Sequence, residues 1–254
     1  MATKLLPLPR PRLHHPPMIP HLQQRRTFLP NPFASSNPLT SSSTDSTSLQ
    51  RLSASRTLAY PHLPIYAIIA DIESYPAFLP FCSAASVTRW SRPDDRYQRL
   101  WPGEAKMSVG YKGFGEDFTS LIFCVPGKVV ESVGGQTETQ LSSSDISHYL
   151  DGPKAAGRGR QDEEDGGILS HLRSRWTLEP MEGRKGKKSH TRVMLDLEFA
   201  FANPFYATLS AGAVPKVADY MIKAFEERVD ELLKERDDLE TVTFTDLAGS
   251  RPER

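Results

Sequence analysis

The sequence contains few cysteines, no long apolar run and no net charge. Only Cys82 and Cys124 occur, in separate segments without CxxC spacing, which excludes a disulfide scaffold and a cysteine-rich zinc site. No apolar run reaches the roughly 18 residues that a membrane-spanning helix needs. Lys and Arg together number 31, as do Asp and Glu. This balance excludes a strongly basic surface, and with it nucleic acid as a main partner.

Acidic residues are missing from the start of the chain, where the first is Asp45. Residues 1–48 carry five basic residues and a Ser/Thr-rich stretch at 41–48, a composition typical of an organelle transit peptide. Six prolines between positions 7 and 20 disfavour an amphipathic targeting helix there. The alternative is a disordered Pro/Ser tail. We expect residues 1–48 to be a mitochondrial transit segment.

After residue 48 the apolar pattern predicts a strand, two short helices, about six strands and one long helix. Alternation predicts the strands, most clearly where Val193, Leu195 and Leu197 alternate with polar neighbours. The strands are expected at 52–60, 87–92, 97–111, 116–125, 128–133, 168–178 and 193–201, and the short helices at 64–72 and 74–80. Residues 134–167 lack apolar periodicity and predict an inserted disordered loop. We expect one domain at 49–240, followed by a C-terminal tail at 241–254.

The last predicted element is a long helix, capped by Asn203 with Pro204 at its first position. Pro215 must kink this helix or divide it in two. Its apolar stripe comprises Phe205, Leu209, Ala213, Val217, Met221, Phe225, Val229 and Leu232. An antiparallel sheet with one apolar face needs a cover, and only this helix is large enough. The fold class is therefore α+β, with a curved antiparallel sheet wrapped around a long C-terminal helix and a ligand-sized wedge between them.

Common catalytic motifs are also missing. The sequence contains no Ser-His-Asp or Cys-His arrangement, no HExxH and no nucleotide-binding glycine loop. The acid–base candidates are Asp71, Glu73, Glu116, Asp117 and His171. The first two lie between the short helices, where helix capping is expected. At least one of Glu116 and Asp117 must face outward, and His171 is expected to face solvent. We expect no catalytic residue, no metal ligand and no catalytic cofactor.

Residues 70–82, with the sequence ADIESYPAFLPFC, resemble the ADV-x-x-Y-P-x-F-L-P-x-C pattern of the coenzyme Q-binding proteins, which belong to the START-like, polyketide-cyclase-type superfamily. Four further segments are similar to this family in the expected order: VGYKG at 109–113, EDFTS at 116–120, LRSRWTL at 172–178 and YMIKAFEER at 220–228. The resemblance covers 52–133 and 168–233. Tyr111 and Leu178 replace the more usual phenylalanines.

The resemblance implies a START-like helix-grip fold that binds ubiquinone in an apolar cavity. It implies a non-enzymatic carrier or chaperone that supports respiratory electron transport and ubiquinone biosynthesis, in peripheral contact with the matrix side of the mitochondrial inner membrane. The residues expected to line the cavity are Phe78, Met107, Val109, Tyr111, Trp176, Leu195, Leu197, Phe199, Val217, Met221 and Phe225. The competing interpretation of each single residue is that it fills the core.

Two other functions remain open at this point. The first is a cyclase- or hydratase-type enzyme on the same fold. The second is an interaction module that contacts ribosomes, because bacterial relatives in the family are described as ribosome-association toxins. Association of copies of the chain into a homo-oligomer is also left open.

Overall fold

The computed structural model describes residues 49–111, 114–150, 169–181, 189–203, 205, 214–239, 241, 243–244 and 249–252. The expected transit segment at 1–48 lies outside these residues. The elements in order are β1 (Gln50–Leu58), α1 (His62–Ala70), η1 (Ile72–Ala77), β2 (Cys82–Trp90), β3 (Arg99–Leu100), β4 (Pro102–Tyr111), β5 (Phe114–Val125), β6 (Val129–Gly135), α2 (Ser147–Leu150), β7 (Leu169–Met181), β8 (His190–Phe201), η2 (Val214–Lys216), α4 (Val217–Leu233) and β9 (Arg251–Pro252).

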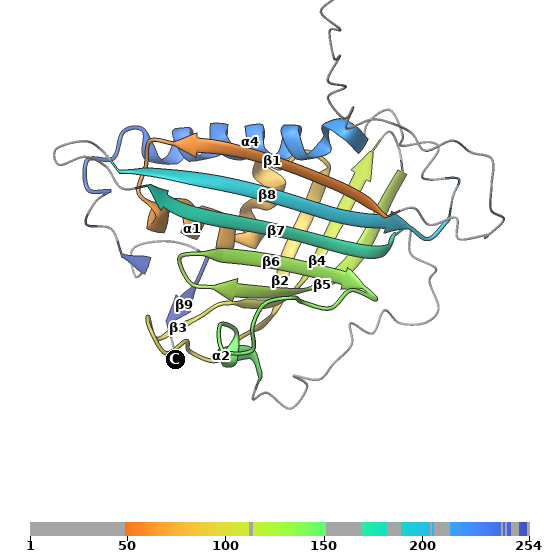
Figure 1. The fold of residues 1–254 in the computed structure, drawn as a ribbon, viewed down its shortest axis with the longest axis horizontal. Helices are drawn as coiled ribbons and strands as arrows, with labels where there is room; N and C mark the ends of the chain where they lie inside the picture. The colour runs from red at the N-terminus through yellow and green to blue at the C-terminus, as the bar shows by residue number, and fades with distance from the viewer. Residues whose placement is uncertain are drawn as a thin grey trace, which may run out of the picture. The chain divides into compact units, whose positions relative to one another are not determined.

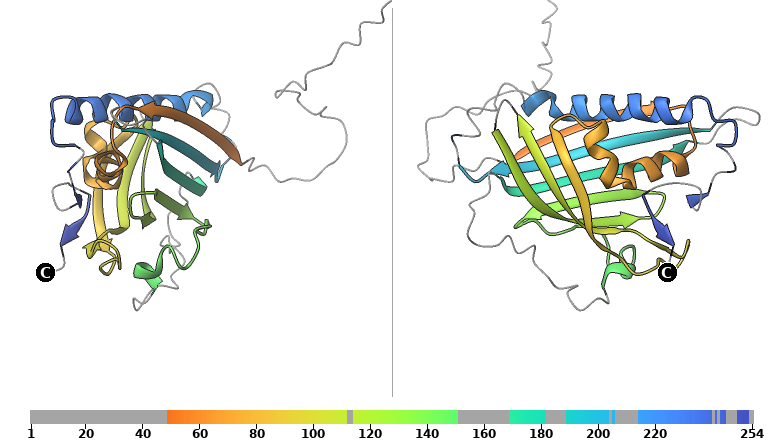
Figure 2. Two further views of the ribbon diagram at one scale, coloured as in Figure 1. Left: turned by 60° about the vertical axis from the view of Figure 1, so that its left-hand side comes forward. Right: turned by 180° about the vertical axis from the view of Figure 1, so that it is seen from behind.

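Seven strands form one antiparallel sheet in the order β1-β8-β7-β6-β5-β4-β2. The sheet curves strongly, and α4 extends along its β1–β8 side while α1 and η1 lie within the curve (Figures 1 and 2). Helix α4 packs against β1, β8 and α1, and α1 packs against β6 and β7. This architecture confirms the predicted helix-grip class, with a curved sheet wrapped around the C-terminal helix.

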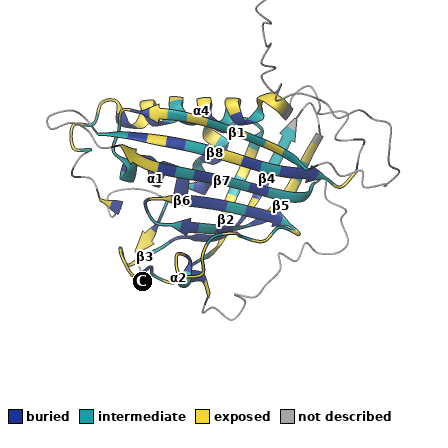
Figure 3. Ribbon diagram, viewed as in Figure 1, coloured by how far each residue is buried: buried dark blue, intermediate teal, exposed yellow. Residues whose placement is uncertain are grey.

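The sheet has an apolar concave face, which α4 covers at β1 and β8 and α1 at β6 and β7. Along β8, the side chains of Val193, Leu195 and Leu197 are buried, whereas those of Arg192 and Asp196 are exposed. Figure 3 shows this alternation of burial along β8 and the exposed outer side of α4. Because partners in a strand register share a face, the inner rows can be followed from strand to strand across the sheet.

Helix α4 begins later than expected. Phe205 has a helical backbone, residues 204 and 206–213 of the predicted helix lie outside the described residues, and Pro215 lies in η2 directly before α4. The predicted kink or division at Pro215 concerns a helix whose earlier part lies outside the described residues, so it stays a prediction. The Asn203 side chain accepts a hydrogen bond from the Phe205 amide.

The apolar stripe of α4 is rotated relative to its predicted position. The buried residues are Ala218, Ile222, Phe225, Val229 and Leu233. Leu232 is 41% exposed, so its predicted place in the buried stripe is wrong, and the fully buried member next to Met221 is Ile222. Phe205 is 62% exposed and does not join the stripe. Since each residue turns the helix by about 100°, Val217 and Met221 lie at the flank of the buried stripe and are half-buried.

The prediction of a disordered loop at 134–167 is wrong for residues 134–150. Gly134 and Gly135 complete β6, and residues 136–150 continue as ordered chain that ends in α2. Ile146 and Tyr149 belong to the core. The Tyr149 hydroxyl accepts a hydrogen bond from the Cys124 amide at 3.0 Å and donates one to the Pro102 carbonyl at 2.9 Å. Residues 151–168 lie outside the described residues.

The described residues of the tail expected beyond residue 240 pack against the fold. Phe244 is buried against Tyr97 and Trp101, with ring centroids 4.6 and 5.1 Å away. The Arg99 guanidinium donates hydrogen bonds to the Ser250 hydroxyl and carbonyl at 2.9 and 3.1 Å, and β9 pairs with β3. The domain boundary at 240 is therefore a correction.

Gly249 marks where this tail meets α1. Its φ is +86°, and a Cβ there would lie 2.5 Å from the Ala67 carbonyl oxygen. Only glycine combines this backbone conformation with so close an approach.

Candidate functional site

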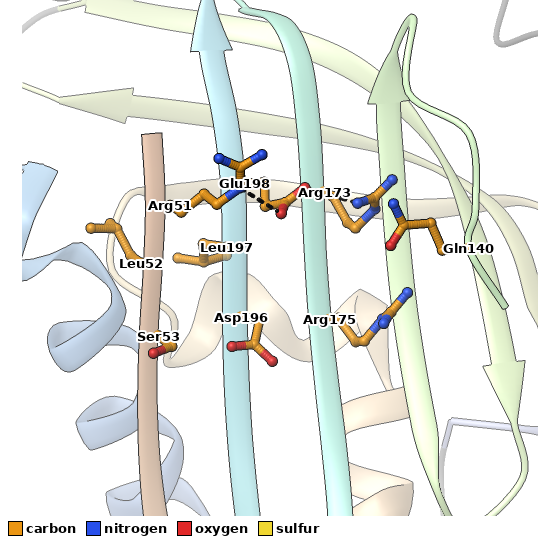
Figure 4. Close-up of a pocket in the computed structure, with 9 residues that line it drawn as sticks. All are labelled: Arg51, Leu52, Ser53, Gln140, Arg173, Arg175, Asp196, Leu197 and Glu198. Carbon is orange, nitrogen blue, oxygen red and sulfur yellow. Dashed lines mark hydrogen bonds and ion pairs between the residues drawn. The ribbon is translucent and has the colours of Figure 1, made fainter. Parts of the chain in front are cut away.

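The two faces of the sheet offer chemically different sites. The outer face carries a polar pocket of about 330 Å³, shown in Figure 4. It is lined by Arg51, Leu52, Ser53, Gln140, Arg173, Arg175, Asp196, Leu197 and Glu198. Strands β1, β7 and β8 supply all of these residues except Gln140, which comes from the segment after β6.

Ion pairs within the protein engage the three arginines of this outer pocket. Arg173 donates a hydrogen bond to Glu198 at 2.8 Å, and Arg51 donates one to the same carboxylate at 3.1 Å. Arg175 binds Glu131, whose side chain is fully buried below the pocket. Three arginines therefore face three acids, Glu131, Asp196 and Glu198. This balance gives the pocket no net preference for an anion or a cation, and we assign it a structural role.

The pKa of Glu198 reflects this network. Burial acts to raise it, but the neighbouring Arg51, Arg173 and His171 together hold the pKa below its usual value. His171 lies on the face opposite Trp176, as predicted, but it does not simply face solvent. Its Nδ1 lies 2.9 Å from the Thr137 hydroxyl, and its Nε2 lies 3.8 Å from Glu198.

The protein is expected to lose stability as the pH falls below about 6.5. Burial lowers the pKa of His62, His148 and His171 from 6.5, with a further contribution from a nearby arginine in each case. Below pH 6.5 these histidines are therefore protonated more fully in the unfolded chain than in the folded protein. As the pH falls from 6.5 through the folded pKa values, the free energy of unfolding decreases. The urea midpoint should be lower at pH 5.5 than at pH 7.5, and His148→Gln should reduce this difference. An equal or higher midpoint at pH 5.5 would contradict the expectation.

The acid–base candidates do not converge on one site. Asp117 faces outward beside Lys106 and Ser108. Glu116 lies on the inner face, because its register partner is Val109. His171 lies on the outer face of β7, so the sheet separates it from Glu116, and β6 lies between the strands that carry His171 and Asp117.

The other two candidates lie near η1. Asp71 occupies the N-cap position of η1, but its side chain makes no capping hydrogen bond there, so the predicted capping contact is wrong. Burial raises its pKa. Glu73 accepts a hydrogen bond from the Val87 amide and forms an ion pair with Arg251 at 3.5 Å. Its role is to hold β2 and the C-terminal segment.

The inner face brings most of the predicted lining residues together. Met107, Trp176, Leu195, Leu197 and Phe225 belong to the core cluster, and Phe78, Val217 and Met221 pack against it. The Phe225 ring centroid lies 4.9 Å from that of Trp176 and 6.4 Å from that of Phe78.

Three predicted residues lie at the margins of this set. Phe199 is buried on the inner face, with Leu172 opposite it. Val109 is half-buried near the end of β4. Tyr111 ends β4, and its side chain lies outside the described residues.

Sequence reasoning missed the polar groups of the inner face. Ser120, Ser132 and Ser174 point to the same side as Ile122, Val130 and Trp176 respectively, because they are two residues away along the same strands. The sequence did contain a sign of them, because in each of these strands a serine takes one of the alternate positions whose other members are mostly apolar. Cys124, also on this face, is fully buried, and burial raises its thiol pKa to about 12, so it stays protonated at neutral pH.

Comparison with known proteins places this geometry in a family. The model of the family described as "Polyketide cyclase / dehydrase and lipid transport" matches residues 58–226. The chain is 27% identical to "Coenzyme Q-binding protein coq10, mitochondrial" of Schizosaccharomyces pombe over 175 residues, which covers 69% of this chain and 84% of that protein. It is 25% identical to the protein of the same name from Dictyostelium discoideum, covering 70% and 67%.

Two further similarities are more distant. The chain is 24% identical to "Ribosome association toxin RatA" of Pseudomonas aeruginosa, covering 74% of this chain and 98% of that protein. Among solved structures, the Zhui aromatase/cyclase from Streptomyces sp. R1128 aligns with a TM-score of 0.49 at 15% identity, covering 74% and 98%. In the described part of the chain, no helix is both long and apolar enough to cross a membrane.

The match of the family model over residues 58–226 and the similarity to the named relatives confirm the resemblance that the sequence motifs indicated. The chain belongs to the polyketide cyclase / dehydrase and lipid transport family, in which it is similar to the coenzyme Q-binding proteins.

Proposed function

We propose that the chain binds ubiquinone between the concave face of the sheet and α4, and acts as a carrier or chaperone without transforming it. In this proposal it supports respiratory electron transport and ubiquinone biosynthesis, in peripheral contact with the matrix side of the mitochondrial inner membrane. The names of its curated relatives, which are coenzyme Q-binding and mitochondrial, support both the ligand and the organelle.

The observation that carries the proposal is incomplete burial within an apolar face. Phe118 and Leu172 lie on the concave side of the sheet, and Val217 and Met221 lie at the flank of the buried stripe of α4, yet all four are only half-buried. Apolar side chains that α4 does not fully cover can bury a hydrocarbon ligand at about 25 cal/mol per Å². A long isoprenoid tail needs this kind of surface.

The lining residues keep distinct roles in this proposal. Trp176, Leu195 and Phe225 form the floor of the site. They are buried in the core, so they support the ligand and also stabilise the fold. Val109, Val217 and Met221 form the contact surface at the margin. Phe78, which lies between Tyr75 and Phe225, closes the side next to η1.

Organic extraction of the purified mature domain, followed by mass spectrometry, tests the proposal. We expect stoichiometric ubiquinone in the wild type and loss of most of it in Met221→Glu and Val217→Glu, because a carboxylate is costly to bury in an apolar site. Both variants should remain folded by circular dichroism, since neither residue is fully buried. Tyr220→Glu is the matched control, because Tyr220 is on the same helix and 48% exposed, and it should retain the lipid.

An empty wild-type protein that also fails to take up added ubiquinone would contradict the proposal. Mixed phospholipid in the extract would contradict the ligand assignment. We do not favour ribosome association, because the formal net charge of the chain is zero and binding to RNA phosphates depends on basic residues. We do not favour a cyclase-type enzyme, because the acid–base candidates lie on different faces.

A further inference from the structure

Three serines interrupt the apolar concave face on adjacent strands. Ser120 is on β5, Ser132 on β6 and Ser174 on β7, and Ser132 lies directly opposite Ser174 in the β6–β7 register. Gly134, two residues after Ser132, leaves space beside the first serine. A Cβ at Gly134 would lie 3.3 Å from the Ser120 hydroxyl oxygen. The hydroxyls therefore form one small polar patch in the middle of the sheet.

Two of these hydroxyls have unused hydrogen-bonding capacity. The Oγ atoms of Ser120 and Ser132 are buried and have no hydrogen-bond partner, and Ser120 is only 1% exposed. A hydroxyl taken out of water without a partner destabilises the folded state. Such groups are uncommon in native structures and call for a specific explanation. A ligand oxygen that accepts their hydrogen bonds supplies one.

The surroundings indicate which kind of ligand fits. The residues that lie opposite one another on neighbouring strands form rows across the sheet. In the rows that contain the serines, the neighbours include Ile122, Leu172 and Leu197. From β4 to β8 these rows contain no Asp, Glu, Lys or Arg. A phosphate or carboxylate would be buried there without a counter-charge, which is unfavourable. A neutral molecule with acceptor oxygens and an apolar body is the complementary chemistry.

The patch also has a defined place relative to α4. Trp176 contacts Phe225, and β7 and α4 run in the same general direction (Figure 1). Ser174 lies two residues before Trp176, and Met221 lies one helical turn before Phe225. Both are therefore displaced toward the same end of the molecule, so the serine patch and the half-buried flank of α4 belong to one region.

We propose that the hydroxyls of Ser120 and Ser132, with Ser174 beside them, donate hydrogen bonds to the ring oxygens of the bound quinone. This inference rests on the proposed function and deepens it. The carbonyl and methoxy oxygens of a ubiquinone ring are neutral acceptors, and the apolar floor around the serines accommodates the ring. The polar patch sets the position of the headgroup, and the tail extends from it along the Val217 and Met221 flank of α4.

Affinity measurements with two probes test the inference. Decylubiquinone has the ring oxygens, whereas decylbenzene has a similar tail and a ring without them. Ser120→Ala and Ser132→Ala should each weaken decylubiquinone binding by about fivefold to tenfold, the effect of one net hydrogen bond. The affinity for decylbenzene should be unchanged. Ser55→Ala, an exposed serine on the outer face of β1, should change neither affinity.

Thermal unfolding without ligand provides the second measurement. Removal of an unpaired buried hydroxyl should leave the melting temperature of Ser120→Ala equal to or above that of the wild type. Weaker quinone binding with undiminished stability supports the inference. A lower melting temperature with equal losses for both probes would show a packing role and overturn it. Unchanged decylubiquinone affinity would overturn it while leaving the proposed function intact, whereas a wild type that binds no quinone would overturn both.

Discussion

Glu131→Ala is expected to lower the free energy of unfolding by about 3 kcal/mol or more. The carboxylate is fully buried on the outer side of β6. It accepts hydrogen bonds from Arg175 and from the Thr139 hydroxyl, and the Nε of Arg173 lies 4.0 Å away. Without it, two arginines on β7 lose a counter-charge, and the segment that follows β6 loses its contact through Thr139.

Urea unfolding followed by circular dichroism measures this effect. Arg51→Ala is the control, because its ion pair with Glu198 involves a side chain that is 67% exposed, and it should cost no more than about 1 kcal/mol. If both variants were destabilised equally, Glu131 would be no more important than a surface charge. The assignment of a structural role to the outer network would then be wrong.

Phe244→Ala is expected to lower the free energy of unfolding by about 3–5 kcal/mol, the usual cost of removing a buried aromatic ring. Phe244 is 3% exposed. Its ring makes edge contacts with Tyr97, Trp101 and Tyr66 at centroid distances of 4.6, 5.1 and 5.6 Å. The substitution would leave a cavity beside Tyr66 and Trp101, both fully buried, and would weaken the attachment of the C-terminal segment to α1.

The same unfolding experiment tests this prediction, with Phe205→Ala as the matched control. Phe205 is 62% exposed, so its substitution should change stability by no more than about 0.5 kcal/mol. A loss for Phe244→Ala as small as that for Phe205→Ala would show that residues after 240 are dispensable for the fold. The boundary inferred from the sequence would then be correct after all.

The order of strands and helices could be predicted because it depends on local patterns. The alternation through Val193, Leu195 and Leu197 predicted the face of β8 that is buried. Pro215 lies in η2 directly before α4, a place that suits a residue that cannot continue the hydrogen bonding of the preceding turn. The motif at 70–82 and its four companions indicated the family, and the family model matches residues 58–226.

The phase of α4 could not be predicted with the same accuracy. Val217 and Met221 form an apolar series of their own, next to the series of Ala218 and Ile222. Helical spacing alone does not decide which of two adjacent series faces the sheet. The contacts of α4 with β1 and β8 select the second series and leave the first at the flank.

The remaining features depend on partners far apart in the chain. Arg99 binds Ser250 across 151 residues, and Arg175 binds Glu131 across 44. The polar segment 136–150 and the described residues between 241 and 252 have the composition of loops, because their order comes from packing on distant strands.

The sequence by itself determined the class of fold, the family and the apolar character of the inner face, since these follow from local periodicity and from motifs. Only the tertiary structure decided which side chains are fully buried, which remain half-covered, and that the hydroxyls of Ser120 and Ser132 lie without partners on that face. The reason is physical: periodicity determines the direction of a side chain, whereas burial and hydrogen bonding depend on what the rest of the chain places against it.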